Sequence, residues 1–268
     1  MTVTAARVVL VGGGNMGAAL LGGMFAAGWA RPDEVAVVEV LAARRAALVD
    51  QFPGVSVTDS VPAAEGAVIA VKPNDVAAAV AAAVAAGARR VLSIAAGVSI
   101  TTLEAAAASA TSERVAVVRA MPNTPALVGE GAAAIAGGAA ATESDLEWAE
   151  SILGAVGSVV RVPEYQLDAV TGLAGSGPAY LFLVAEALVD AGVLAGLARP
   201  VSEALVTQLF VGSAALLADR GDAAGLRAMV TSPAGTTAAG LHQLESHGVR
   251  AAFQDAVMAA TRRSRELG

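Results

Sequence analysis

The sequence contains no cysteine, a single lysine and only two histidines. Without cysteine the chain has no disulfides, zinc thiolates or cysteine nucleophiles, and this composition is compatible with a reducing cytosol. His242 and His247 are five residues apart and have no clustered carboxylates beside them, so no metal site is expected. Lys72 is therefore the one side-chain amine that the protein has for chemistry.

Positive charge is in the minority. Lysine and arginine number 17 against 24 acidic residues, a formal net charge of −7, which argues against a nucleic-acid-binding surface. The longest uncharged stretch, residues 8–30, has the length of a membrane span but holds seven glycines and Asn15. A strand, a turn and a helix explain it better than a spanning helix or a secretory signal. We expect a cytoplasmic protein that binds neither membranes nor nucleic acid.

Short apolar runs alternate with alanine-rich stretches over the first 160 residues or so. The apolar runs predict strands at residues 7–11, 35–39, 55–58, 67–71, 90–94, 115–119, 131–135 and 158–162. Helices are predicted at residues 18–27, 41–51 and 75–86, and capping-box spacings predict two more helix starts at Thr101 and Thr142. Apolar strands that alternate with helices indicate an α/β fold with a mostly parallel sheet covered on both faces.

The pattern changes after Pro163, where no convincing strand remains. Helices are predicted at residues 167–194, 200–219, 225–229, 237–246 and 249–266, punctuated by Gly175-Ser176-Gly177-Pro178, by Arg220-Gly221 and by residues 231–235. We therefore predict a first domain over residues 1–162 and an all-helical domain over residues 163–268. The stretch 181–217 has few charges on any face, and a helix that is apolar all round must be buried. About 105 residues cannot bury it alone, so the helices predict a homodimer.

A glycine-rich turn follows the first predicted strand. Gly12-Gly13-Gly14-Asn15-Met16-Gly17 fits G-x-G-x-x-G, between a strand and a helix, which is the context that the motif requires. In such a turn the first glycine permits the bend, the second lets a pyrophosphate approach the backbone, and the third lets helix and strand pack closely. The helix N-terminus then attracts the phosphates. The motif predicts a dinucleotide site; a plain glycine-rich turn is the alternative.

An acidic residue, Glu39, ends the second predicted strand, 22 residues after Gly17. At that place a carboxylate hydrogen-bonds the ribose 2′-hydroxyl and repels a 2′-phosphate, which favours NADH. Arg44 and Arg45 in the next helix are close enough in sequence to turn back towards a phosphate, so NADPH stays open. A solvated charge at the end of a strand is the other interpretation of Glu39.

A second turn, residues 231–237, opens a helix in the C-terminal half. A turn with hydroxyls and glycine at a helix N-terminus can bind an anion. The amides near Gly235, Thr236 and Thr237, with the Ser232 hydroxyl, would suit a substrate carboxylate. Ordinary N-capping by serine or threonine is the simpler local interpretation.

With these motifs, the whole chain resembles the pyrroline-5-carboxylate reductase family. The resemblance rests on the glycine turn with Asn15 and Met16, on residues 70–73 (AVKP), 119–125 (RAMPNTP), 175–180 (GSGPAY) and 231–237 (TSPAGTT), and on Leu241, Leu244 and Glu245. It implies a Rossmann-like N-terminal domain, a helical dimerisation domain, and reduction of 1-pyrroline-5-carboxylate to proline by NADPH or NADH, the last step of proline biosynthesis.

The resemblance also implies an active site at the subunit interface. Thr237 would be the catalytic residue that hydrogen-bonds the ring nitrogen, while Ser232, Gly235 and Thr236 help to hold the carboxylate. The implied cofactor-binding residues are Gly12, Gly14, Asn15, Met16, Gly17, Glu39, Val71, Lys72, Pro73, Met121 and Asn123. The sequence departs from the family's usual residues at Val40 (often arginine), Ala174 (usually serine) and Ala234 (usually glycine).

The shortage of acid–base residues also bears on the reaction. Carbonyl reduction needs a proton donor, commonly lysine, histidine or tyrosine, and the helical half contains no lysine. An imine is basic enough to be protonated before hydride arrives, so the protein need supply only binding and orientation. The composition therefore favours an imine substrate. Reduction of another imine or of a 2-oxo acid, a non-catalytic NAD(P)H sensor, and assembly of dimers into a larger ring stay open.

Overall fold

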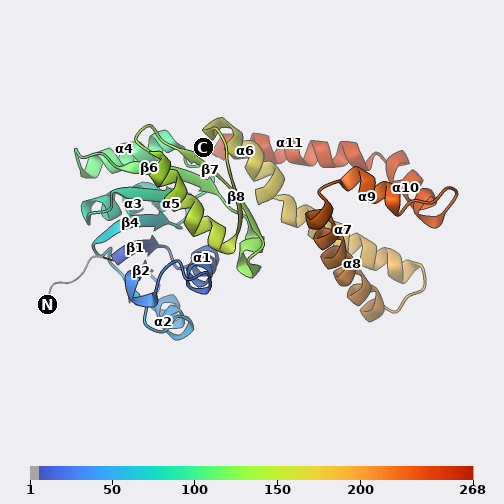
Figure 1. Cartoon of the computed structure of the whole chain (residues 1–268), viewed down its shortest axis with the longest axis horizontal. Helices are drawn as coiled ribbons and strands as arrows, with labels where there is room; N and C mark the ends of the chain where they lie inside the picture. Colours follow the sequence, from blue (N-terminus) through green and yellow to red (C-terminus); the bar gives the residue numbers. More distant parts are fainter. Residues whose placement is uncertain (1–5, 268) are drawn as a thin grey trace. The chain divides into compact units, whose positions relative to one another are not determined.

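The computed structural model describes residues 6–267, which form two compact units (Figure 1). The first contains the described residues up to Ser176 and those from Ala259 onward, and the second is Gly177–Met258. Residues 164–176 belong to the first unit because Leu167 is completely buried in its core. A functional domain boundary at residue 162 stays a prediction.

The first unit is built on one eight-stranded sheet. Its strands are β1 (Ala6–Val11), β2 (Val35–Val38), β3 (Ser56–Thr58), β4 (Ala64–Ile69), β5 (Arg90–Ser93), β6 (Ala116–Met121), β7 (Gly131–Gly137) and β8 (Gly157–Arg161). They lie in the order β3-β2-β1-β4-β5-β6-β7-β8, and every neighbouring pair is parallel except β6 and β7. The predicted, mostly parallel sheet is confirmed, although β4 begins and ends earlier than predicted.

Helices connect these strands. The α-helices are α1 (Asn15–Ala26), α2 (Ala42–Gln51), α3 (Val76–Ala85), α4 (Ile100–Ala110), α5 (Glu143–Leu153) and α6 (Leu167–Val170). Short 3₁₀ helices are η1 (Pro32–Glu34), η2 (Pro73–Asp75), η3 (Thr124–Val128), η4 (Gly154–Val156) and η5 (Glu164–Gln166). The stretch from residue 8 to residue 30 is thus a strand, a turn and a helix, as predicted, followed by a short loop.

Side chains of the central strand β1 alternate between two apolar cores. Val9 and Val11 pack on one face of the sheet with residues of α3 and α4, whereas Val8 and Leu10 pack on the other with residues of α1 and α5. Successive residues of a strand point to opposite faces, so a strand that is buried on both faces must be apolar throughout. The prediction of a sheet covered on both faces is confirmed (Figure 1).

One of the two predicted helix starts is correct. The Asp145 carboxylate accepts a hydrogen bond from the Thr142 amide at 2.8 Å, so Thr142 is the N-cap of α5. The prediction at Thr101 is wrong, since α4 begins at Ile100 and its N-cap is Ser99, whose hydroxyl oxygen accepts from the Thr102 amide at 3.2 Å. Ser99 and Thr101 are only two residues apart, so the segment contains two hydroxyl side chains that could cap the helix.

The predicted helix over residues 167–194 is interrupted. After α6 the backbone forms a π-helical segment, η6 (Thr171–Gly175), and α7 (Gly177–Leu194) then begins. An α-helix would pair the Ala174 carbonyl with the amide of residue 178, which is a proline and has no N–H. The wider π turn lies directly before the proline that lacks this N–H. Such turns are frequent at functional sites.

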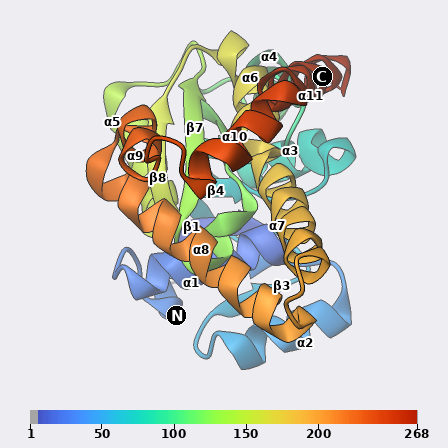
Figure 2. The same ribbon diagram turned by 90° about the vertical axis from the view of Figure 1, so that its right-hand side faces the viewer.

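The second unit contains only helices among the residues that the structure describes. They are α7, α8 (Arg199–Arg220), α9 (Ala223–Met229), α10 (Thr236–Ser246) and the first part of α11 (Val249–Leu267). α7 and α8 pack against each other, and the Ser202 hydroxyl of α8 donates to the Val189 carbonyl at 2.9 Å (Figure 2). The predicted absence of strands beyond residue 163 is confirmed for the described part of the chain.

The outer surfaces of α7 and α8 are strongly apolar. Twelve large apolar side chains on these two helices are exposed in the single chain: Leu181, Phe182, Leu183, Leu188, Val193, Leu194, Val201, Leu205, Leu209, Val211, Leu216 and Leu217. By length and composition alone, the stretches Glu164–Leu194 and Arg199–Arg220 are also long and apolar enough to cross a membrane. An apolar surface of this size on a folded domain needs a covering partner.

Candidate functional site

The glycine turn after β1 has the geometry that its sequence predicts. Gly12 has a φ of +109°, and a Cβ there would lie 2.5 Å from the Ala70 carbonyl oxygen. A Cβ at Gly17 would collide with the Gly12 carbonyl oxygen, so helix and strand meet only because that atom is missing. A Cβ at Gly14 would meet nothing within 4 Å. The first and third glycines therefore serve the fold, and the second leaves open space over the backbone.

The N-terminus of α1 is available to an anion. Its N-cap is Gly14, which provides no side-chain cap, and no acidic residue lies in the first turn. The first amides of a helix have no partner within the helix and carry partial positive charge. Gly14 and Asn15 are both exposed, so a phosphate can approach these amides from solvent. The turn fits the pyrophosphate of a dinucleotide.

The parallel strands bring the other predicted cofactor residues to the same edge of the sheet. Glu39 follows β2, residues 71–73 follow β4, and Met121 ends β6, each at the carboxyl end of its strand. Ligands of open α/β sheets bind at this edge. Lys72 and Pro73 are exposed there, where η2 begins. The structure thus places the predicted cofactor residues on one rim.

The Glu39 carboxylate contacts the glycine turn directly. Its Oε2 accepts a hydrogen bond from the Gly13 amide at 3.1 Å, and its Oε1 accepts one from the Leu41 amide at 2.9 Å. Glu39 is half-buried, so it is not simply a solvated charge at the end of a strand. The side chain connects the loop after β1 to the start of α2.

Asn123 has a structural role that sequence reasoning missed. Its Nδ2 donates to the Ala174 carbonyl at 3.1 Å, and its Oδ1 accepts from the Ala132 amide at 2.8 Å. The Ala174 carbonyl is the one that Pro178 cannot pair, so Asn123 supplies the missing donor. The side chain of Asn123 therefore joins the loop after β6 to η6 and β7.

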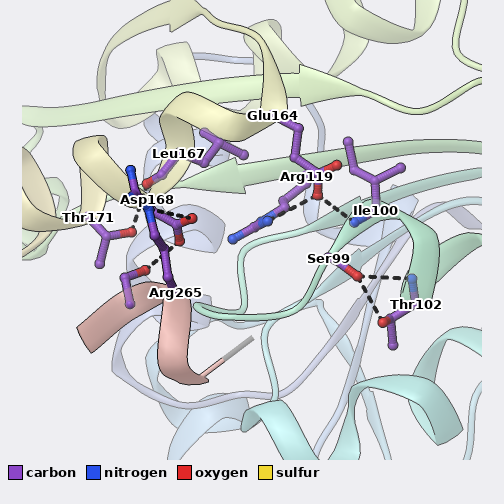
Figure 3. A network of polar contacts seen from close by, with 10 residues as sticks. Ser99, Ile100, Thr102, Arg119, Glu164, Leu167, Asp168, Thr171 and Arg265 are labelled. Atoms are coloured by element: carbon purple, nitrogen blue, oxygen red, sulfur yellow. Dashed lines mark hydrogen bonds and ion pairs between the residues drawn. The ribbon is translucent and has the colours of Figure 1, made fainter. Parts of the chain in front are cut away.

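A polar network holds the segment that leads to η6 (Figure 3). One oxygen of Glu164 accepts from the Ile100 amide at 2.7 Å and from the Arg119 guanidinium at 3.0 Å. Asp168 accepts from the Ser264 hydroxyl at 2.7 Å. Sequence reasoning named Arg119 only as part of the 119–125 motif and gave none of these residues a role, although a charged side chain inside the apolar strand β6 was a visible signal. The network fixes residues 164–168 against α4, β6 and the end of α11.

The second predicted site, the turn before α10, does not use the expected cap. The N-cap of α10 is Gly235, and no side chain caps this helix. Within residues 6–267 neither the Ser232 nor the Thr237 hydroxyl has a protein partner, whereas the Thr231 hydroxyl donates to the Arg227 carbonyl at 2.6 Å. Capping by serine or threonine, the simpler local interpretation, is therefore wrong. The Ser232 hydroxyl oxygen lies so close to Gly235 that a Cβ at Gly235 would collide with it.

Ala234, inside this turn, has a φ of +58°, and it is the one residue other than glycine that has a positive φ in the described chain. Left-handed backbone costs an L-residue about 1–2 kcal/mol. Glycine at this place loses about 0.5–1 kcal/mol more entropy on folding, which offsets part of the gain. Alanine at position 234 therefore strains the turn.

We expect Ala234→Gly to raise the stability of the protein slightly. Relief of the left-handed strain exceeds the added entropy by about 0.5–1 kcal/mol, so the thermal midpoint should rise by about 1–3 °C. Ala239→Gly in the exposed interior of α10 is the matched control and should lower it. A midpoint that falls equally in both variants would show that Ala234 is not strained.

Within the described residues no group of three or more histidine, cysteine, aspartate or glutamate side chains could hold a metal ion. His247 follows α10, where its Nδ1 lies 2.7 Å from the Gln243 carbonyl, and His242 is exposed.

Comparison with known proteins covers both parts of the chain. Residues 164–267 match a family described as pyrroline-5-carboxylate reductase dimerisation, and residues 7–97 match one described as NADP oxidoreductase, coenzyme F420-dependent. A pyrroline-5-carboxylate reductase of Mycobacterium leprae is 45% identical over all of this chain and 98% of its own length. One of Methanosarcina acetivorans is 41% identical, with 98% of each chain covered.

Solved structures agree with these sequence relatives. A pyrroline-5-carboxylate reductase of Coxiella burnetii superposes with a TM-score of 0.90 at 32% identity, with 99% of each chain covered. A pyrroline carboxylate reductase of Plasmodium falciparum, solved with NADP bound, gives a TM-score of 0.83 at 28% identity, with 98% of each chain covered. The α/β unit followed by a helical unit is therefore the architecture of these enzymes.

Proposed function

This chain belongs to the pyrroline-5-carboxylate reductase family, and on that premise we propose that it reduces 1-pyrroline-5-carboxylate to proline with NAD(P)H. The observation that carries the proposal is 45% identity to such a reductase along the whole chain, because shared identity over both units covers the cofactor and the substrate parts together. The enzyme is then an oxidoreductase of proline biosynthesis.

The glycine turn is the proposed cofactor site. Gly12 and Gly17 shape the turn, Gly14 leaves room for the pyrophosphate, and the first amides of α1, at Asn15 and Met16, face it. Residues 71–73 and Met121, on the same rim, are proposed to flank the nicotinamide half. Bound there, the reduced nicotinamide supplies a hydride.

The turn before α10 is the proposed substrate site. The substrate carries a carboxylate and a ring nitrogen, and the turn offers partners for both. The amides of Gly235 and Thr236, with the Ser232 hydroxyl, are proposed to bind the carboxylate, because the helix N-terminus has no other cap. Thr237, half-buried in the first turn of the helix, is proposed to hydrogen-bond the ring nitrogen.

The chemistry suits an imine better than a ketone. The second unit has no lysine to act as the general acid that reduction of a ketone needs. A protonated imine takes up hydride at carbon while its nitrogen keeps the proton that it already has. Thr237 then orients the ring nitrogen and need not supply a proton.

The apolar helices α7 and α8 are the proposed dimer interface. The family model for dimerisation covers both helices, and their exposed leucines need a partner. A second copy covers this surface without a membrane, and we propose a soluble, cytoplasmic homodimer. Assembly of dimers into a larger ring is a further possibility that belongs to the same proposal.

The assay is oxidation of NADH or NADPH, followed by absorbance, with pyrroline-5-carboxylate as substrate. Wild-type protein should oxidise the cofactor only when the substrate is present. Oxidation that is faster with a 2-oxo acid or with another cyclic imine would favour the alternative reductases. If the protein binds the cofactor but turns over none of these substrates, the result would favour a non-catalytic NAD(P)H sensor.

Thr237→Val should lower kcat/KM for pyrroline-5-carboxylate by about 100-fold, the usual effect of losing one hydrogen bond to the reacting group. Thr237→Ser keeps the hydroxyl and therefore the hydrogen bond, so its kcat/KM should stay within about threefold of the wild-type value. Thr231→Val is the matched control, because the Thr231 hydroxyl already donates to the Arg227 carbonyl of α9. An unchanged kcat/KM in Thr237→Val would remove this role while leaving the reaction assignment intact.

A further inference from the structure

The carboxylate of Glu39 is held in one orientation by two main-chain amides from different loops. The Gly13 amide binds one oxygen at 3.1 Å and the Leu41 amide binds the other at 2.9 Å. Gly13 belongs to the glycine turn, and Leu41 is the N-cap of α2. A side chain held from both sides cannot rotate out of the cofactor site without leaving two amides unpaired.

The two arginines that follow are held by carbonyl groups of the same loops. Arg44 Nε donates to the Gly13 carbonyl at 2.7 Å. Arg45 Nη1 donates to the carbonyls of Glu39 and Val40, each at 2.8 Å. Within the described residues neither arginine lies within ion-pair distance of the Glu39 carboxylate; Arg45 instead approaches Asp59 at 4.0 Å. The negative charge of Glu39 is therefore not neutralised by a paired cation.

The side chain next to Glu39 offers a phosphate no hydrogen-bond donor and no charge. Val40 is apolar and 76% exposed. The Gly13 amide donates to the Glu39 carboxylate, and the Gly13 carbonyl accepts from Arg44. Side chains that follow β2 in the sequence therefore hold both backbone groups of Gly13. The shape of the glycine turn and the position of the carboxylate are set together.

We propose that this chain selects NADH, because the Glu39 carboxylate, fixed by the Gly13 and Leu41 amides, accepts a ribose 2′-hydroxyl and excludes a 2′-phosphate. Arg44 is then a positioning residue that braces the glycine turn and does not bind the phosphate. The inference rests on the proposed function, in that the glycine turn is taken as the dinucleotide site. A carboxylate with both oxygens already bonded can still accept a hydroxyl donor, whereas a phosphate brings further negative charge to an unneutralised one.

The test is equilibrium binding without substrate, measured by calorimetry with four probes. NAD⁺ and NADP⁺ report on the whole cofactor, and 5′-AMP and adenosine 2′,5′-bisphosphate isolate the 2′-phosphate. For wild type we expect Kd for NAD⁺ to be at least about tenfold lower than Kd for NADP⁺. Kd for 5′-AMP should likewise be lower than Kd for adenosine 2′,5′-bisphosphate.

Two substitutions at Glu39 separate its charge from its fixed position. Glu39→Gln removes the charge and should bring the two cofactor Kd values to within about threefold, mostly through tighter NADP⁺ binding. Glu39→Asp keeps the charge but is too short to reach both amides, so it should bind both cofactors more weakly and keep a smaller preference for NAD⁺. Asp50→Asn, an exposed charge removal on α2, is the matched control and should change neither Kd.

Arg44→Met distinguishes a brace from a phosphate ligand. If Arg44 positions the turn, Kd rises by the same factor for NAD⁺ and NADP⁺ and the ratio stays constant. A selective loss of NADP⁺ binding would overturn the inference, as would equal wild-type affinity for the two cofactors or an unchanged ratio in Glu39→Gln. Because no substrate is present, NAD⁺ selectivity without turnover of pyrroline-5-carboxylate would contradict the proposed function and leave this inference standing.

Discussion

Alanine at Gly14 is expected to weaken NADH binding by about 100-fold, which corresponds to about 2.7 kcal/mol, while the protein stays folded. The Cβ would enter open space, with no protein atom within 4 Å, so the fold has no reason to change. The same methyl group would stand where the pyrophosphate must approach the backbone. Calorimetric titration with NADH and the thermal midpoint measure the two effects separately.

Alanine at Gly17 should give the opposite result, a loss of stability. Its Cβ would collide with the Gly12 carbonyl oxygen, a backbone atom that cannot rotate away, and we expect a loss of stability of about 1–3 kcal/mol. Gly22→Ala is the matched control on the same helix, because its Cβ would only touch the Phe52 ring at 3.6 Å. If Gly14→Ala bound NADH like wild type, the open space at Gly14 would not be the pyrophosphate site.

The double substitution Leu205→Asp and Leu209→Asp should convert the protein to monomers. Both leucines are more than half exposed on α8 in the single chain, and a dimer would bury the new carboxylates without partners. Each such charge costs about 3 kcal/mol or more, so the dimer Kd should rise by several orders of magnitude. Analytical ultracentrifugation should show the mass of one chain, 26.3 kDa, where wild type shows twice that value.

The control for that experiment is Val49→Asp, an equally exposed apolar residue on α2 of the first unit. It should remain dimeric. Wild-type protein that sediments as a dimer without detergent would also decide against a membrane location for α7 and α8. A double variant that stays dimeric would move the interface away from this face of α8.

Much of the α/β unit was predictable because local rules act on neighbouring residues. The apolar run before Gly12 predicts a strand that is buried on both faces, and Gly12 and Gly17 lie where a Cβ would collide with backbone atoms. The Asp145 carboxylate pairs with the Thr142 amide three residues away, so that cap was visible in the sequence. At Thr101 the same rule failed, because Ser99 competes for the cap.

Other features depend on residues that are far apart in the chain. The Asn123 side chain donates to the Ala174 carbonyl, which Pro178 cannot pair because it has no N–H. This contact can be seen only in the folded chain, where the loop after β6 lies beside η6. Arg119 and Glu164 meet in the same way, with Ile100 as the third partner. No local pattern contains such a pair, since each residue is ordinary in its own segment.

The sequence by itself determined the two architectures, the dinucleotide turn and the apolar helices that need a partner, because periodicity and backbone constraint are properties of consecutive residues. Only the tertiary structure decided that Glu39 is fixed by the Gly13 and Leu41 amides, that Arg44 binds the Gly13 carbonyl, and that the helix after residue 231 has no side-chain cap. The physical reason is that a hydrogen bond depends on the distance and direction between two groups, and the folded backbone sets both.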